Sequence, residues 1–93
     1  MRTKSKELEC AWDYLKRRVA VGDIVATTNS RSNMMHTGMI TRITDATIYL
    51  RHTAFDPETR TLTLFKETFR KNNYQASEND FILVDPHLYR KNW

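Results

Sequence analysis

The sequence has little of several features that commonly define a class of protein. It contains one cysteine, Cys10, together with two glycines and two prolines among its 93 residues. A lone cysteine cannot form a disulfide within the chain and is typical of a reducing compartment. No apolar run approaches the roughly 18 residues of a membrane-spanning helix. In a signal peptide the basic start is followed by an apolar segment. The basic start of this sequence, MRTKSKELEC, is not. We therefore expect a cytoplasmic protein without membrane contact, in the host cytoplasm if it is viral.

The sequence also lacks the motifs of the common catalytic sites. Gly22 and Gly38 stand alone, so there is no glycine-rich phosphate loop. The histidines are His36, His52 and His87, and none has a partner at the spacing of a zinc site, although His36 and His52 can meet across neighbouring strands. No nucleophile motif surrounds a serine. We therefore predict that the protein is not an enzyme and uses no cofactor and no metal.

The length of the chain indicates the number of domains, and its charge indicates the classes of partner that it can bind. Ninety-three residues predict a single domain over residues 1–93, with one hydrophobic core. The net charge is +4, of which residues 1–22 carry +3, and nine of the fifteen cations are arginine. Arginine favours planar, bidentate contacts with phosphates and carboxylates. The charge therefore permits either a nucleic acid or an acidic protein surface as the partner.

Residues 5–19 are predicted to form an amphipathic helix. Five apolar residues recur at three- and four-residue spacing and would form one stripe: Leu8, Ala11, Trp12, Leu15 and Val19. We expect this stripe to cover the core, with Trp12 buried. Arg17 and Arg18 would lie in the last turn, where they either compensate the helix dipole or contact phosphates.

From residue 23 to residue 84 the alternation of β-branched and polar residues predicts five short strands. Their expected ranges are 23–28, 34–44, 47–52, 61–66 and 81–84, with a long connection over 67–80 and a C-terminal tail over 85–93. In the second strand Met39 and Ile43 would share one face, while Ile40 would lie on the other. This parity requires a bulge, a bend at Gly38, or cover on both faces.

The stretch VGDIVATTNSRSNMMHTGMITRIT, residues 21–44, resembles the start of the SH3-like small barrels of the KOW type. These domains occur in transcription and ribosome-associated proteins. The resemblance depends on Gly22-Asp23 before the first strand, on the loop around Arg31, and on Gly38 followed by Met39 and Ile40. It implies an α+β, mostly β fold, in which the N-terminal helix precedes a five-stranded antiparallel SH3-like small barrel over residues 23–84. It also implies a contact with nucleic acid.

One outer face of the expected sheet combines arginine with tyrosine. If the second and third strands pair through Asp45-Ala46, Arg42 lies nearly opposite Tyr49, and Arg51 falls on the same face. An arginine beside an exposed tyrosine suits stacking with an unpaired base and a phosphate contact. The alternative is an ordinary solvated sheet face. With the adjoining loop, the helix end and the 67–80 connection, the predicted nucleic-acid-binding residues are Arg31, Arg42, Tyr49, Arg51, Arg17, Arg18, Arg70 and Lys71.

These features support two functions. The first is a small, non-catalytic binding or regulatory protein that contacts RNA or DNA through the surface of residues 29–51. The second is a protein–protein interaction module, for example a viral modulator that inhibits or redirects a host protein. Nucleic-acid binding weakens steeply with salt because counterions are released from the phosphates, whereas protein binding through an apolar anchor depends less on salt.

Overall fold

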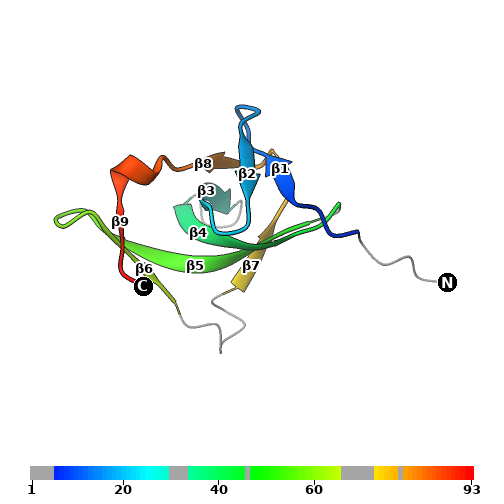
Figure 1. Cartoon of the computed structure of the whole chain (residues 1–93). Helices are drawn as coiled ribbons and strands as arrows, with labels where there is room; N and C mark the ends of the chain where they lie inside the picture. The colour runs from blue at the N-terminus through cyan, green and yellow to red at the C-terminus, as the bar shows by residue number, and fades with distance from the viewer. Residues whose placement is uncertain (1–5, 30–33, 46, 66–72, 78) are drawn as a thin grey trace.

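The computed structural model in Figure 1 shows a domain built from β-strands, and it describes residues 6–29, 34–45, 47–65, 73–77 and 79–93. Within these residues there is no α-helix. The elements are β1 (Cys10–Trp12), β2 (Arg18–Ala20), β3 (Ile24–Asn29), β4 (Met34–Ile43), β5 (Ile48–Asp56), β6 (Thr61–Leu64), β7 (Asn73–Ala76), β8 (Phe81–Leu83), the 3₁₀ turn η2 (Pro86–Leu88) and β9 (Arg90–Lys91).

The strands form one small hairpin and one large sheet. β1 and β2 pair only with each other, and the larger sheet has seven strands in the order β8-β3-β4-β5-β6-β9, with β7 also paired to β5. All pairs are antiparallel except β6 with β9, which run parallel. The predicted mostly β fold is therefore confirmed, and its five predicted strands correspond to β3, β4, β5, β6 and β8.

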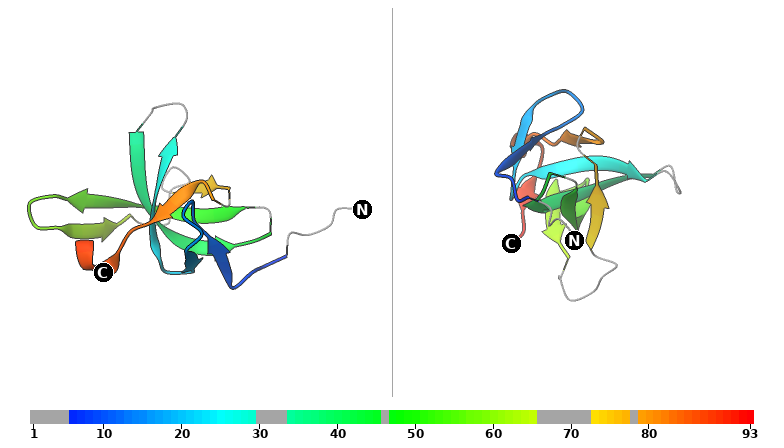
Figure 2. Two further views of the ribbon diagram at one scale, coloured as in Figure 1. Left: turned by 90° about the horizontal axis from the view of Figure 1, so that it is seen from above. Right: turned by 90° about the vertical axis from the view of Figure 1, so that its right-hand side faces the viewer.

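The predicted five-stranded barrel is wrong, because the sheet is not closed. β5 is nine residues long and has two successive partners on the same edge. Its first half, Ile48–Arg51, pairs with β7, and its second half, Thr53–Asp56, pairs with β6. The sheet consequently splits, and Figure 2 shows β5 and β6 extending away from the other strands instead of returning to close a barrel. β7 lies in the stretch for which the sequence predicted only a connection.

The predicted helix over residues 5–19 is also wrong, because β1 and β2 occupy this segment. Ala11 pairs with Val19 across the hairpin, and both side chains are fully buried. Trp12 and Leu15, which the helix would have buried, are 45% and 59% exposed. An isolated helix of this length is marginal in water, and Asp13 favours a turn because its side chain binds nearby backbone N–H groups. The period-two alternation around Ala11 and Val19 therefore prevails over the helical spacing.

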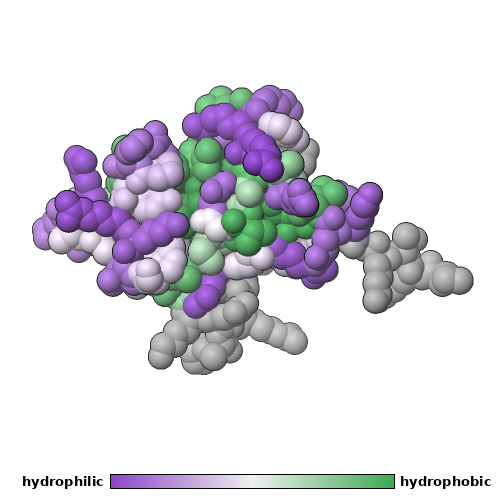
Figure 3. Space-filling view, viewed as in Figure 1, coloured by the Kyte–Doolittle hydropathy of each residue, from purple (hydrophilic) through white to green (hydrophobic). Residues whose placement is uncertain are grey.

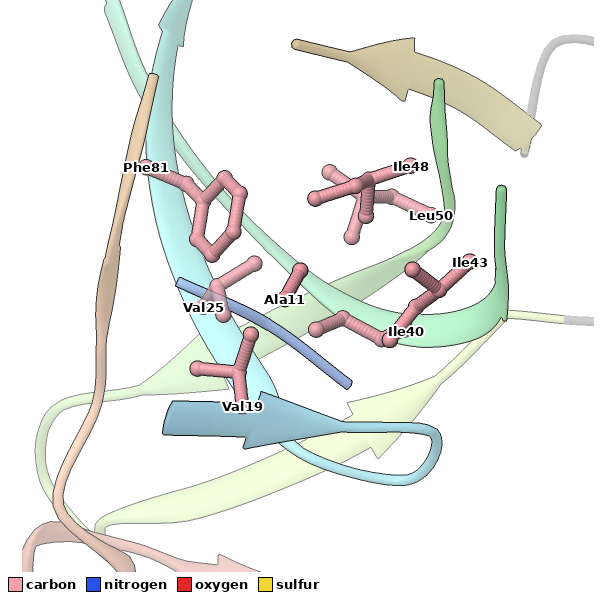
Figure 4. Close-up of a cluster of buried hydrophobic side chains, with 8 residues drawn as sticks. All are labelled: Ala11, Val19, Val25, Ile40, Ile43, Ile48, Leu50 and Phe81. Atoms are coloured by element: carbon pink, nitrogen blue, oxygen red, sulfur yellow. The ribbon is translucent and has the colours of Figure 1, made fainter. Parts of the chain in front are cut away.

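The core lies between the β1–β2 hairpin and the inner face of the large sheet, and Figure 4 shows its side chains pointing toward one another. Its members are Ala11, Val19, Val25, Ile40, Ile43, Ile48, Leu50 and Phe81. A register shift between Ile40 and Arg42 marks a β-bulge in β4, which places Ile40 opposite Leu50 and Ile43 opposite Ile48. The predicted irregularity in this strand is thus confirmed, but it lies after Gly38, and Ile43 shares a face with Ile40 and not with Met39.

The C-terminal tail makes a short turn, η2, and then pairs with the sheet. The segment from Val84 onward is bonded to two buried residues that lie outside the main cluster, Ile24 and Leu62. The backbone N–H of Val84 donates to Ile24 O at 2.9 Å, and that of Asn92 donates to Leu62 O at 2.9 Å. The tail over 85–93 therefore belongs to the folded structure through β9, and its end lies beside β6 (Figure 1).

Candidate binding surfaces

The outer face of β4 and β5 brings together three of the predicted site residues. Arg42 pairs in register with Tyr49, as the sequence predicted, and its guanidinium carbon lies 5.4 Å from the centre of the tyrosine ring. This is the geometry of a cation–π contact. Arg51 follows Tyr49 at a spacing of two, so its side chain leaves the strand on the same face. The predicted juxtaposition of Arg42, Tyr49 and Arg51 is therefore confirmed.

The two arginines of this face already have partners within the protein. Nε of Arg42 donates to Glu7 Oε1 at 2.7 Å, in a salt bridge in which both side chains are at least half exposed. Nε of Arg51 donates to the carbonyl oxygen of Phe65. An exposed salt bridge contributes only ~0–1 kcal/mol, so a ligand can displace it. However, Glu7 reduces the positive charge that a phosphate would meet here.

The other predicted residues divide into two groups. Arg31, Arg70 and Lys71 lie outside the residues that the structure describes. Arg17 and Arg18 are described, and they differ in role. Arg17 donates from Nε to Asp13 Oδ2 at 2.9 Å and from Nη2 to Leu83 O at 3.0 Å, which are contacts that hold the fold. Arg18 is exposed, pairs with Trp12 across the hairpin, and forms no ion pair in the described part of the chain.

The turn between β1 and β2 is organised by Asp13, whose side chain is completely buried. Oδ1 accepts hydrogen bonds from the backbone N–H groups of Leu15 at 2.9 Å and Arg17 at 2.7 Å. Oδ2 accepts from Arg17 Nε at 2.9 Å and from the backbone N–H of Leu83 at 3.0 Å. One carboxylate thus holds the turn in shape and ties it to β8. Four donors around a buried carboxylate are enough to offset the cost of removing its charge from water.

The same turn covers the outer edge of β8, which would otherwise be an unpaired strand edge. The backbone N–H of Tyr14 donates to Phe81 O at 2.8 Å, Leu83 N–H donates to Asp13, and Leu83 O accepts from Arg17. Exposed strand edges promote aggregation by pairing with other chains. The turn therefore protects the edge of the sheet and is itself fixed in place.

Acid is expected to weaken the fold through Asp13. Burial alone raises the pKa of this carboxyl group, but hydrogen bonds from the Leu83 and Arg17 backbone and the charge of Arg17 outweigh it, so the pKa lies below its ordinary value. The lowered pKa contributes stability that is complete above about pH 4, the range of an unfolded aspartate. This contribution disappears as the pH falls through the folded-state pKa. Urea unfolding between pH 6 and pH 2.5 should show a steeper loss in wild type than in Asp13→Asn. Equal pH dependence in the two proteins would contradict this account.

Residues 12–18, which we call the hairpin tip, present apolar side chains to solvent. Tyr14 is 68% exposed, Leu15 59% and Trp12 45%. At the top of Figure 3, where the hairpin tip projects, apolar and polar surface lie side by side. Three cations follow directly in the chain, Lys16, Arg17 and Arg18, all exposed. Trp12, Tyr14 and Leu15 were not predicted as surface residues. The local signals that mark the hairpin are Asp13, a turn-favouring residue, and the buried Ala11 and Val19, each between less buried neighbours.

A shallow groove adjoins the hairpin tip and extends its apolar surface. The groove has a volume of about 280 Å³, and Tyr14 and Ile82 contribute to its walls, with Thr27 and Asp80 among its other lining residues. Ile82 is 40% exposed. The hydroxyl of Thr27 donates to Asp80 O at 2.8 Å, which holds the chain before β8 against β3. Tyr14 and Ile82 thus form one surface although they lie far apart in the sequence.

Two of the three histidines, His36 and His52, lie close together across neighbouring strands, as the sequence suggested. The rings of His36 and His52 are 5.7 Å apart between their centres and nearly perpendicular. Burial lowers the pKa of His52, and the neighbouring His36 lowers it further. Among the described residues there is no group of three or more histidine, cysteine, aspartate or glutamate side chains able to hold a metal ion. His87 lies elsewhere, on η2.

These features define a small β-sheet domain with a rigid hairpin that exposes aromatic and basic side chains. The chain belongs to the family described as domain of unknown function DUF7205, which matches residues 12–75. The match includes the whole hairpin tip and strands β2 to β6. No curated protein and no solved structure matches the chain. In the part of the chain that the structure describes, no helix has the length and apolar character needed to cross a membrane.

Proposed function

We propose that the protein is a small, non-catalytic binding or regulatory domain that contacts single-stranded RNA or DNA in the cytoplasm. The observation that carries this proposal is the hairpin tip, where exposed Trp12 and Tyr14 stand beside Lys16 and Arg18. Proteins that bind single strands combine aromatic platforms, on which bases stack, with cations that follow the phosphates.

The charges around the hairpin tip support this assignment. Among the described residues, Lys16 and Arg18 take part in no salt bridge. Asp13, the acidic residue of the tip, is buried and directed at Arg17 and the backbone. A phosphate approaching the tip therefore meets two exposed cations. The β4–β5 face with Arg42, Tyr49 and Arg51 provides a second and weaker contact, because Glu7 must first release Arg42.

Rigidity favours binding at the hairpin tip, because a surface that is already ordered loses little entropy when a ligand arrives. Asp13 fixes the backbone of Leu15 and Arg17, and the turn is bonded to β8 through Tyr14. Lys16 has a φ of 63°, a left-handed conformation that is costly for a lysine. A turn that retains this conformation and exposes three large apolar residues is better suited to recognition than to folding alone.

A fluorescence titration tests the proposal. The chain has two tryptophans, so Trp93→Phe leaves Trp12 as the sole indole. Adding a 12-nucleotide single strand should quench Trp12 emission as a base stacks on it. Tyr14→Ala in this background should weaken binding by ~1–3 kcal/mol through the loss of stacking. Arg18→Gln should lower the slope of log affinity against log salt by ~0.7. Both side chains are exposed, so these variants should keep the fold.

Matched variants on the other face complete this experiment. Tyr49→Ala and Arg42→Gln replace the same residue types on the β4–β5 face, and they should change the affinity less than Tyr14→Ala and Arg18→Gln. Stronger effects at Tyr49 and Arg42 would move the interface to β4–β5. An affinity that is unaffected by any of the four would exclude both surfaces as the interface, and no binding at low salt would exclude nucleic acid as the ligand.

The alternative function is a protein–protein interaction module, such as a viral modulator of a host protein. It is favoured by the exposed apolar side chains of Leu15 and Ile82 beside Trp12 and Tyr14, because the buried centre of a protein interface is more apolar than its rim and is enriched in aromatic residues. This module would use the same hairpin tip and groove against an acidic partner surface. Its binding should depend on Leu15 and little on salt, whereas Leu15→Ser should have a small effect on binding of an oligonucleotide.

A further inference from the structure

We propose that a second site, distant in the chain from the hairpin tip, binds a phosphate group. The turn between β5 and β6 meets the C-terminal segment in a cleft of about 240 Å³, which we call the C-terminal cleft. The residues that matter for the argument all line this cleft: Glu58, Thr59, Arg60, His87, Tyr89 and Arg90. The proposal goes beyond the function proposed for the hairpin tip and does not depend on it.

The backbone brings the two arginines of the cleft together. The parallel pairing of β6 with β9 places Thr61 beside Arg90, and the backbone N–H of Arg90 donates to Arg60 O at 2.7 Å. His87 reaches the same cleft from η2, whose start is fixed because Asp85 Oδ1 accepts from the His87 backbone N–H at 2.9 Å. Three nitrogen-bearing side chains from two distant segments therefore border one space.

The charges in the C-terminal cleft are not balanced. In the described structure neither Arg60, His87 nor Arg90 takes part in a salt bridge. Glu58 is the one acidic residue among those that line the cleft, beside two arginines in that lining. Burial raises the pKa of Tyr89, and the charges of Asp23 and Asp85, which reach this residue, raise it further. Guanidinium groups that lie close together repel each other unless an anion lies between them, and their planar donors match the oxygens of a phosphate in pairs. The hydroxyls of Thr59 and Tyr89 add further donors.

The size of the cleft limits the ligand to a small group. About 240 Å³ is well above the ~30 Å³ share of one water molecule and below the ~300–1,000 Å³ of pockets for drug-sized ligands. The donor set consists of guanidinium, imidazole and hydroxyl groups, which favours a tetrahedral oxyanion over a carboxylate of a large molecule. The chemical class is therefore a phosphate group, either a phosphomonoester or a phosphodiester of a nucleic-acid backbone.

The left-handed backbone conformation of Arg60 is a separate observation in favour of a binding role for this residue. It ends the four-residue turn between Asp56 and Thr61 with a φ of 56°. Hairpin turns normally place glycine or asparagine in such left-handed positions, because a larger side chain is strained there. Strained residues that persist in a fold often serve binding. The chain has an arginine here, in the lining of a cleft that also includes Arg90.

The conformation of Arg60 gives a sharp test. Arg60→Gly should raise the melting midpoint by a few degrees in chloride buffer, because glycine relieves the left-handed strain. The same variant should lose the stabilisation that inorganic phosphate gives to wild type at matched ionic strength. Lys91→Gln is the matched control: it removes an exposed cation from β9, directly beside Arg90 in the chain but outside the lining of the cleft, and should keep the full response to phosphate.

Arg90→Gln provides a second variant that leaves the turn unchanged, and it should also lose most of the phosphate response. Two oligonucleotides that differ only in a 5′-phosphate then separate the sources of the ligand. A tighter complex with the phosphorylated strand, abolished by Arg60→Gly, assigns a phosphomonoester, and equal affinity for both strands, reduced by Arg60→Gly, assigns the phosphodiester backbone. The proposal is overturned if phosphate does not raise the midpoint of wild type, or if Arg60→Gly and Lys91→Gln respond alike.

Discussion

Replacing Asp13 with alanine is expected to lower the free energy of unfolding by about 3–5 kcal/mol. The carboxylate is fully buried and accepts four hydrogen bonds, three from backbone N–H groups and one from Arg17. Alanine leaves those N–H groups without an acceptor, and each buried orphan donor costs ~1–3 kcal/mol. A domain of this size has a total stability of only ~5–15 kcal/mol. The variant should therefore be marginally folded at 25 °C.

Two further variants test whether the buried hydrogen bonds of Asp13 are the cause of the lost stability. Asp13→Asn keeps one acceptor oxygen and places an NH₂ group where the second oxygen met Arg17 and Leu83, so we expect it to recover at most half of the lost stability. Asp56 begins the turn between β5 and β6, is exposed, and accepts a hydrogen bond from Glu58 N–H at 3.0 Å. Asp56→Ala should cost only ~0.5–1.5 kcal/mol. Urea unfolding followed by far-ultraviolet circular dichroism measures all three. Similar losses for Asp13→Ala and Asp56→Ala would show that burial of Asp13 is not what stabilises the turn.

The strands that could be predicted from the sequence are those in which alternation is strong. β3, β4 and β5 contain β-branched residues, and of the three outcomes that the parity conflict between Ile40 and Ile43 allowed, the structure shows the bulge. The contact of Arg42 with Tyr49 followed from the short connection between the two strands. In each case the determining information lies within a few neighbouring residues, and local pattern is sufficient.

The N-terminal segment could not be predicted in this way, because its structure depends on a partner far away in the chain. Asp13 accepts one of its hydrogen bonds from Leu83 N–H, 70 positions later, and this bond, which ties the turn to β8, has no local sequence signal. Without that partner, the spacing of Leu8, Trp12 and Leu15 is that of an amphipathic helix. The error affected the candidate site directly, since Trp12 was expected in the core and is instead half exposed.

The open sheet and the C-terminal cleft were missed for the same reason. The splitting of β5 between β7 and β6 depends on the register of three strands, and β9 pairs with β6 through only two residue pairs. Neither feature has a local sequence signal. Arg60 and Arg90 are separated by about one third of the chain, so nothing in the sequence alone indicates that they line one cleft.

Phe81→Ala is expected to have an effect as large as that of Asp13→Ala, at about 3–5 kcal/mol. Phe81 is the largest fully buried side chain, and it reaches the core from β8, which is only three residues long and is paired to β3 alone in the sheet. Figure 4 shows its ring directed at Val25 and Ala11. Ile82, the next residue on the same strand, is 40% exposed, so Ile82→Ala should cost well under 1 kcal/mol.

The loss of Phe81 should also spread to the hairpin tip, because β8 is the element against which the tip is held. Tyr14 N–H is bonded to Phe81 O, and Asp13 is bonded to Leu83 N–H, so a loosened β8 releases both. Amide hydrogen exchange should therefore accelerate at Tyr14 and Leu83 in Phe81→Ala, while it stays slow at Ile43 and Leu50, whose strands pair with each other and not with β8. Uniform acceleration at all four amides would mean that the domain opens as one unit, and that the hairpin tip is as stable as the sheet beneath it.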